Sequence, residues 1–272
     1  MSEPIHPDTA LGAVTLTVND LERTRGFYER AIGLRTLDST PQAVLLGDAA
    51  GSPLLELAGR PDAAARPPRT TGLFHLALLV PSRQDLARAV RRVIEAGWAF
   101  TGAADHLVSE ALYPDDPEGN GIEIYRDRPR ERWPRVAGTL QMATDPLDLE
   151  GVMSTLAVGA PVDGMPAGSR LGHVHLQVAD LGEAEAFYGG VLGFDVTVRH
   201  YPGALFLSAG GYHHHIGLNV WAGRGAPAPP PGARGLSRFE VAVPDARELA
   251  RIGERVAAAG LPSADEGGAL VV

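Results

Sequence analysis

The chain contains 272 residues, of which 44% are hydrophobic and 21% are charged, and its formal net charge is −9. This length and composition predict a globular protein with enough apolar residues for two domains. The acidic balance leaves no basic stripe that could neutralise phosphates, which argues against nucleic-acid binding. The sequence contains no cysteine, so disulfides, thiolate metal ligands and thiol nucleophiles are excluded.

The sequence has neither an apolar span of about 18 residues nor a basic and then apolar leader. We therefore expect a cytoplasmic protein that does not contact membranes and whose partners are small molecules. A bound metal would take its ligands from the nine histidines and from carboxylates. Such ligands favour Fe, Mn, Co, Ni or Zn.

An internal repeat divides the chain into four modules. Residues 11–16 (LGAVTL) and 171–176 (LGHVHL) match at an offset of 160 residues, and a second pair of segments starts at Gly72 and Gly235 with an offset of 163. Repetition that keeps its register over such segments is not expected by chance. The modules begin near Leu11, Leu73, Leu171 and Leu236.

The first module opens with a predicted strand, because apolar side chains alternate along residues 13–18. A helix is predicted over residues 21–32, with Asp20 as its N-cap and Gly33 as the residue that ends it. The third module repeats this pattern from Asp180 onward. Shorter strands are predicted at residues 43–46, 54–57, 204–207 and 214–220.

Residues 127–168 lack the module pattern and contain five prolines, so they are predicted to form a connector. A short helix is expected within it, near residues 149–156. The predicted domains are therefore residues 1–126, with two modules, and residues 169–272, with the other two.

A family resemblance rests on three features: a strand followed by Asp-Leu, a helix that contains Phe-Tyr, and the later segment 116–123 (DPEGNGIE). This pattern resembles the vicinal oxygen chelate superfamily of glyoxalases, bleomycin resistance proteins and extradiol dioxygenases. Residues 210–219 (GGYHHHIGLN), the ending at residues 123–129 and the four-module length are most similar to its catechol 2,3-dioxygenase-like branch. The resemblance implies an α+β fold of four βαβββ modules, in two cupped eight-stranded mixed sheets with helices outside.

Two arrangements of the modules are open. Pairing in sequence order, one with two and three with four, is favoured by the long connector. Exchange pairing would instead build one cup from modules two and three. In either case the resemblance implies a divalent ion inside a cup, held by histidine and carboxylate ligands with open positions opposite.

Three side chains of the first two modules match ligand positions of the glyoxalases: Glu56, His75 and Glu123. His75 lies on an alternating strand and Glu123 is flanked by two isoleucines, so both are expected to face the cup. Ala13 stands where the resemblance places a further histidine ligand. The alternative is that the three residues are inherited cavity-wall side chains that hydrogen-bond to one another.

In the third module His173 matches the position of a dioxygenase metal ligand. Arg238 stands where the resemblance places the next ligand, and its positive charge would repel a cation. The final carboxylate would follow Val272, so the last module lacks its last strand, either because the protein is naturally shortened or because the chain is truncated. Under exchange pairing, His75, Glu123 and His173 would form a two-histidine, one-carboxylate triad, which suits Fe(II) and O₂ chemistry.

A histidine triplet at residues 213–215 is predicted to lie on a strand. The resemblance places His214 at the position of an acid and base in oxygen chemistry. Alternation along a strand instead turns His213 and His215 into the cup, and a bulge would reconcile the two. We take His214 and His215 as the candidate catalytic residues; the alternative is a hydrogen-bonded cluster without a catalytic role.

The leading hypothesis is an Fe(II)-dependent extradiol ring-cleaving dioxygenase that acts on a catechol or related vicinal diol, with Mn, Ni, Co or Zn as alternative metals. A second hypothesis is a glyoxalase-like isomerase or lyase that uses Glu56, His75 and Glu123. A third is a metal-free protein that binds a small molecule or drug. The unpaired edge left by a shortened last module leads us to expect a homodimer.

Overall fold

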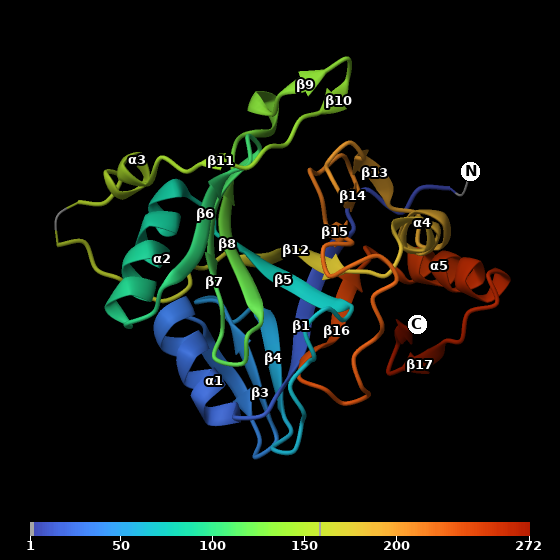
Figure 1. Cartoon of the computed structure of the whole chain (residues 1–272), viewed down its shortest axis with the longest axis horizontal. Helices are drawn as coiled ribbons and strands as arrows, with labels where there is room; N and C mark the ends of the chain where they lie inside the picture. The colour runs from blue at the N-terminus through green and yellow to red at the C-terminus, as the bar shows by residue number, and fades with distance from the viewer. Residues whose placement is uncertain (1–2, 158) are drawn as a thin grey trace.

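The computed structural model describes residues 3–157 and 159–272. Two curled sheets of mixed strand direction carry the fold, and a small number of helices accompany them (Figure 1). The expected α+β class is confirmed.

The smaller sheet has the strand order β16-β1-β4-β3-β2, and the larger has the order β11-β6-β7-β8-β5-β12-β15-β14-β13. The smaller sheet consists of β1 (Ala10–Val18), β2 (Arg35–Ser39), β3 (Ala43–Gly47), β4 (Pro53–Gly59) and β16 (Gly235–Ala242). The larger sheet consists of β5 (Gly72–Leu79), β6 (Phe100–Asp105), β7 (Ser109–Pro114), β8 (Gly121–Asp127), β11 (Asp145–Pro146), β12 (Arg170–Gln177), β13 (Asp195–Val198), β14 (Ala204–Ser208) and β15 (Ile216–Asn219). Two separate hairpins pair β9 (Arg135–Val136) with β10 (Thr139–Leu140) and β17 (Ala264–Glu266) with β18 (Ala269–Val271).

The α-helices are α1 (Leu21–Phe27), α2 (Arg83–Glu95), α3 (Leu149–Met153), α4 (Leu181–Glu185) and α5 (Ala246–Ala258). The short helix predicted in the connector is α3. The first and fourth helices continue into wider π-helical turns, Tyr28–Ile32 and Ala186–Val191. Among the described residues, no helix is long and apolar enough to cross a membrane.

The ends of the first helix follow the predicted signals. Asp20 accepts a hydrogen bond from the backbone N–H of Arg23, which satisfies one of the free donors at the helix start. The helical segment ends at Gly33, whose φ of 84° lies in the left-handed region that glycine adopts most easily. Asp180 caps α4 in the same way as Asp20 caps α1.

The modules pair by exchange, and the expectation of pairing in sequence order is wrong. β5 of the second module pairs antiparallel with β12 of the third, and β1 of the first pairs antiparallel with β16 of the fourth. The predicted pair of eight-stranded sheets is also wrong, because β17 and β18 form their own hairpin and β11 extends the larger sheet. Each sheet draws strands from both sides of the connector, and the domain boundaries drawn around it remain a prediction.

The connector allows exchange pairing because it runs around the second module before the chain returns at β12. On its way it adds β11 to the edge of the larger sheet beside β6. Its helix α3 lies next to α2, as Figure 1 shows. The length of the connector suggested a linker between two separate cups. In the structure, the connector instead brings β12 alongside β5.

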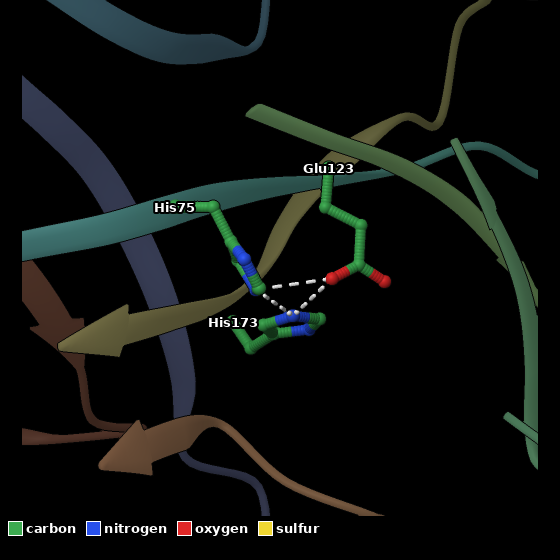
Figure 2. A group of neighbouring side chains, drawn as sticks. All are labelled: His75, Glu123 and His173. Atoms are coloured by element: carbon green, nitrogen blue, oxygen red, sulfur yellow. Dashed lines mark hydrogen bonds and ion pairs between the residues drawn. The ribbon is translucent and has the colours of Figure 1, made fainter. Parts of the chain in front are cut away.

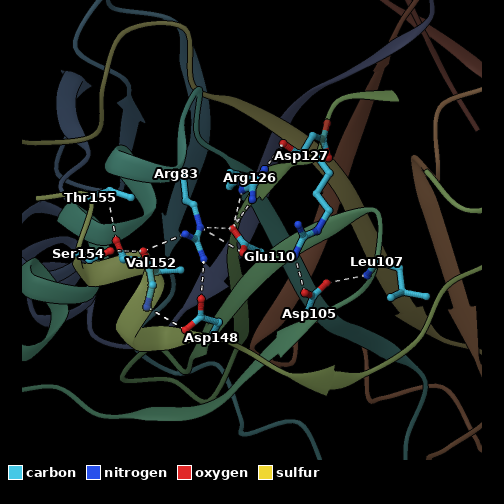
Figure 3. A network of polar contacts seen from close by, with 12 residues as sticks. Arg83, Asp105, Leu107, Glu110, Arg126, Asp127, Asp148, Val152, Ser154 and Thr155 are labelled. Atoms are coloured by element: carbon cyan, nitrogen blue, oxygen red, sulfur yellow. Dashed lines mark hydrogen bonds and ion pairs between the residues drawn. The ribbon is translucent and has the colours of Figure 1, made fainter. Parts of the chain in front are cut away.

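A buried ionic network fastens α3 to the second module (Figure 3). Glu110 on β7 is 1% exposed, and its carboxylate is contacted by three arginines: Arg83, Arg126 and Arg128. Arg83 Nε lies 2.9 Å from Glu110 Oε2, and its Nη1 donates to the carbonyl of Gly151 in α3 at 2.9 Å. Charged groups this deep are retained only when they are paired, so the network ties the connector to β7.

The two faces of β5 have different roles. Leu76 and Leu78 are fully buried in the main hydrophobic core, where β1, β12 and the helices also contribute apolar side chains. His75 and Ala77 alternate with them and therefore lie on the opposite face. This second face carries the candidate site.

Candidate active site

The candidate site is a row of side chains across three neighbouring strands. Ala77 of β5 pairs with Glu123 of the parallel strand β8 on one side and with His173 of the antiparallel strand β12 on the other. His75 precedes Ala77 by two residues and shares its face. The methyl side chain of Ala77, fully buried, leaves room between its two larger neighbours.

The three larger side chains converge on one point (Figure 2). The Nε2 atoms of His75 and His173 lie 3.0 and 3.1 Å from Glu123 Oε2, and 3.3 Å from each other. Their exposed fractions are 6%, 1% and 3% for His75, His173 and Glu123. Within the part of the chain that is described, this is the group whose donor atoms are close enough to hold a single ion.

The donor spacing fits a divalent ion. Bonds of about 2.1 Å at right angles place neighbouring ligand atoms about 3.0 Å apart, close to the three observed separations. Two imidazole nitrogens and one carboxylate oxygen on one face form the donor set of the facial triad found in non-haem iron enzymes. The residues present therefore fit a metal ion.

The protonation states also suit a metal. Burial alone would raise the pKa of Glu123, but its interaction with His173 and the hydrogen bonds with His173 and His75 bring that pKa well below its usual range. Burial lowers the pKa of His173 to about 4, although the nearby Glu123 charge opposes this. A carboxylate beside a neutral imidazole is the state in which these groups bind metal.

A cavity of about 430 Å³ opens in front of the triad. Its walls include the triad residues His75 and Glu123 and several aromatic rings: Phe74, Tyr113, Tyr201, Phe206 and Trp221. Residues 142–144 of the connector also line it, so the connector contributes directly to the site. A planar ligand with polar substituents would contact apolar walls and a polar end in this cavity.

His106 links the connector to the cavity wall, although no motif in the sequence points to it. Its Nδ1 lies 2.6 Å from the carbonyl oxygen of Ala143, and its Nε2 lies 2.6 Å from the hydroxyl of Tyr113. A carbonyl only accepts, so His106 donates from Nδ1, and its Nε2 forms the hydrogen bond with Tyr113. Tyr113 is thereby held at the edge of the cavity.

The histidine triplet does not lie on a strand as predicted, because β15 begins only at Ile216 and the triplet occupies the preceding turn. Strand alternation therefore does not apply to it. His214 lines the cavity, and its ring centroid is 4.0 Å from that of His173. Burial holds the pKa of His214 well below its usual value, so this ring is neutral near neutral pH.

His215 is placed differently from His214. It does not line the cavity; its Nδ1 accepts a hydrogen bond from the backbone N–H of Ala209 at 3.1 Å, and its ring packs against Tyr212. Burial lowers the pKa of His215 to about 4. These contacts hold the turn in place.

Glu56 is not brought to the triad. It lies on β4 in the smaller sheet, where its carboxylate accepts a hydrogen bond from Thr15 at 2.8 Å and lies 3.5 Å from Arg238. Its predicted companions His75 and Glu123 are in the larger sheet. His173 takes the third position instead, as the exchange arrangement requires.

Comparison with known proteins identifies the family. A model of the Glyoxalase/Bleomycin resistance protein/Dioxygenase superfamily matches residues 10–124 and 170–268. The chain therefore belongs to this superfamily, and the resemblance inferred from its sequence is confirmed.

Particular relatives are similar over most of the chain. Catechol-2,3-dioxygenase of Bacillus subtilis (strain 168) is 47% identical over 260 residues, which cover 94% of this chain and 90% of that protein. Biphenyl-2,3-diol 1,2-dioxygenase of Pseudomonas sp. (strain KKS102) is 28% identical over 222 residues, which cover 76% of this chain and 66% of that protein. The structure of glyoxalase I from Zea mays superposes with a TM-score of 0.56 at 16% identity, over 95% of this chain and 83% of that one, and supports the fold alone.

Proposed function

We propose that this protein is an extradiol ring-cleaving dioxygenase that acts on a catechol or a related vicinal diol. The observation that carries the proposal is the buried His75, Glu123 and His173 triad, which faces an aromatic-walled cavity. The 47% identity to a catechol-2,3-dioxygenase supports the same reaction. The leading hypothesis from the sequence is thus the one that the site favours.

The triad would hold one divalent ion, and we propose Fe(II) because this donor set suits iron and O₂ chemistry. An ion bound there would supply Lewis acidity towards the two diol oxygens and a redox couple for reaction with O₂. Exchange pairing makes this site, since His75 and Glu123 come from the second module and His173 from the third. We infer that the chain is built from four βαβββ modules.

Other residues of the cavity bind the aromatic ring of the substrate and accept or donate protons. Phe74, Phe206 and Trp221 offer aromatic faces and edges to a planar substrate. Of the two histidines predicted to be catalytic, we propose His214, because its neutral ring lines the cavity beside the triad. There it would accept a proton from a diol hydroxyl and return it later in the reaction. The homodimer expected from the sequence remains a prediction.

The two alternative functions differ in what they require. A glyoxalase-like isomerase centred on Glu56 is not favoured, because Glu56 lies in the other sheet. A metal-free binding protein would use the same cavity without consuming O₂. Measurement of O₂ therefore separates it from the proposed enzyme.

The test is a reaction of the anaerobically purified chain, reconstituted with Fe(II), with catechol and O₂. We expect equimolar consumption of O₂ and catechol and the appearance of the yellow ring-cleaved product. Glu123→Gln keeps the shape of the side chain but removes its charge, and it should abolish both signals. Catechol binding by the iron-loaded chain without any O₂ uptake would contradict the proposed function.

A further inference from the structure

A chain of hydrogen bonds runs through the protein to His214 in the cavity wall. Asp127 ends β8, and its Oδ1 lies 2.9 Å from Nε2 of His213. The Nδ1 of His213 in turn lies 2.8 Å from Nδ1 of His214. His213 is fully buried and is not among the residues that line the cavity, so its hydrogen bond to His214 connects it to the cavity wall.

The hydrogens in this chain follow from what each group can donate. A carboxylate oxygen only accepts, so His213 donates to Asp127 from Nε2. When His213 carries only this one hydrogen, its Nδ1 accepts from the Nδ1–H of His214. His214 consequently has no hydrogen on Nε2, which is the nitrogen left to accept from a ligand.

A second contact fixes the carboxylate itself. The hydroxyl of Tyr212 donates to Asp127 Oδ2 at 2.9 Å, and the hydroxyl of Tyr125 lies 2.8 Å from that of Tyr212. The two oxygens of Asp127 thus have different donors, which hold the plane of the carboxylate. Because Tyr125 is fully buried with its ring 4.9 Å from that of His173, the whole network is anchored beside the triad.

We propose that Asp127 and His213 are positioning residues that hold His214 in the tautomer with its hydrogen on Nδ1. This inference rests on the proposed function and explains how the site prepares its proton acceptor. When the diol loses a proton, the O–H bond breaks, its electron pair stays on oxygen and an N–H bond forms at His214 Nε2. The positive charge that results on His214 is stabilised by Asp127 through His213.

The tautomer can be measured without any reaction. The full chain is freed of metal with a chelator, labelled with ¹⁵N at histidine and examined by long-range ¹H–¹⁵N NMR, with His214 assigned from the signals that a His214→Gln variant loses. We expect the hydrogen on Nδ1 in the unmodified chain. Asp127→Asn should turn its amide N–H towards His213 while its oxygen still accepts from Tyr212. Both histidines should then switch tautomer, placing the hydrogen on His214 Nε2.

Tyr212→Phe is the matched control, because it removes the other hydrogen bond to the same carboxylate and should leave the tautomer of His214 unchanged. In the iron-loaded enzyme, Asp127→Asn should lower kcat roughly 10²-fold, within the range that a general base contributes, with KM and metal content nearly unchanged. A hydrogen on His214 Nε2 in the unmodified chain would overturn the proposal, as would an Asp127→Asn variant with the original tautomer and kcat. Absence of ring cleavage in the unmodified chain would count against the proposed function and leave the NMR result standing.

Discussion

At the scale of single residues, Ala77 is as important to the site as the three side chains around it. Its backbone pairs with Glu123 on one side and His173 on the other, so any larger side chain at this position would enter the space between them. The sequence marks Ala77 only as one small apolar residue in a strand. Its role depends on which strands lie beside β5.

The Ala77→Leu variant should lose most of its metal binding while keeping its fold. The added atoms occupy the space between the ligands, and overpacking of this kind costs about 1–3 kcal/mol of unfolding free energy. Metal content after reconstitution and far-UV circular dichroism would check both expectations. The control is Ala89→Leu, because Ala89 is also fully buried but lies in α2. It should lower the free energy of unfolding by a similar amount without loss of metal. Normal metal content in Ala77→Leu would show that the site lies elsewhere.

At the scale of elements, the sequence predicted the strands and helices that carry strong local signals. Alternation along β5 placed His75 on the face opposite to Leu76 and Leu78, and the capping residue Asp20 marked the start of α1 correctly. The strand predicted for the histidine triplet is wrong, because the chain turns there and β15 starts only at Ile216. A turn, unlike a strand, has no periodic pattern of side chains from which it could be predicted.

The contacts that the connector makes with the rest of the chain could not be predicted from the sequence. Its proline content predicts irregular structure, which is correct outside α3 and the short strands β9 to β11. Its attachment to the second module uses long-range contacts, which include ion pairs, the β11–β6 pairing and buried apolar side chains. Glu110 takes part in this attachment, and no pattern near it in the sequence predicts that three arginines contact its carboxylate.

The Glu110→Ala variant should lower the free energy of unfolding by about 3 kcal/mol, because it removes a 1% exposed carboxylate that three arginines share. Denaturant unfolding would measure the change. Glu95→Ala is the control: Glu95 forms an ion pair with Arg91 on the same helix as Arg83, but its side chain is 56% exposed, so the cost should stay within about 0.5 kcal/mol. Equal effects of the two substitutions would mean that the network does not stabilise the connector.

At the scale of the whole molecule, the decisive feature is which modules share a sheet. The repeat in the sequence identified the modules, and the family resemblance indicated their candidate ligands. Two ways of pairing the modules stayed open. Local pattern cannot choose between these, because β5 would present the same edge to either neighbour. Pairing with β12 brings His173 to His75 and Glu123, and it leaves Glu56 in the other sheet beside Arg238.

The most direct test of this account is the metal content of three chains reconstituted with Fe(II) under anaerobic conditions: the unmodified protein, Glu123→Gln and Glu56→Gln. A site shared by the second and third modules predicts that the unmodified chain and Glu56→Gln each bind a single ion with similar affinity. Glu123→Gln should bind at least roughly 100-fold more weakly, since even residues that only support a ligand can cost that much. Loss of the ion from Glu56→Gln, or its retention in Glu123→Gln, would contradict the account.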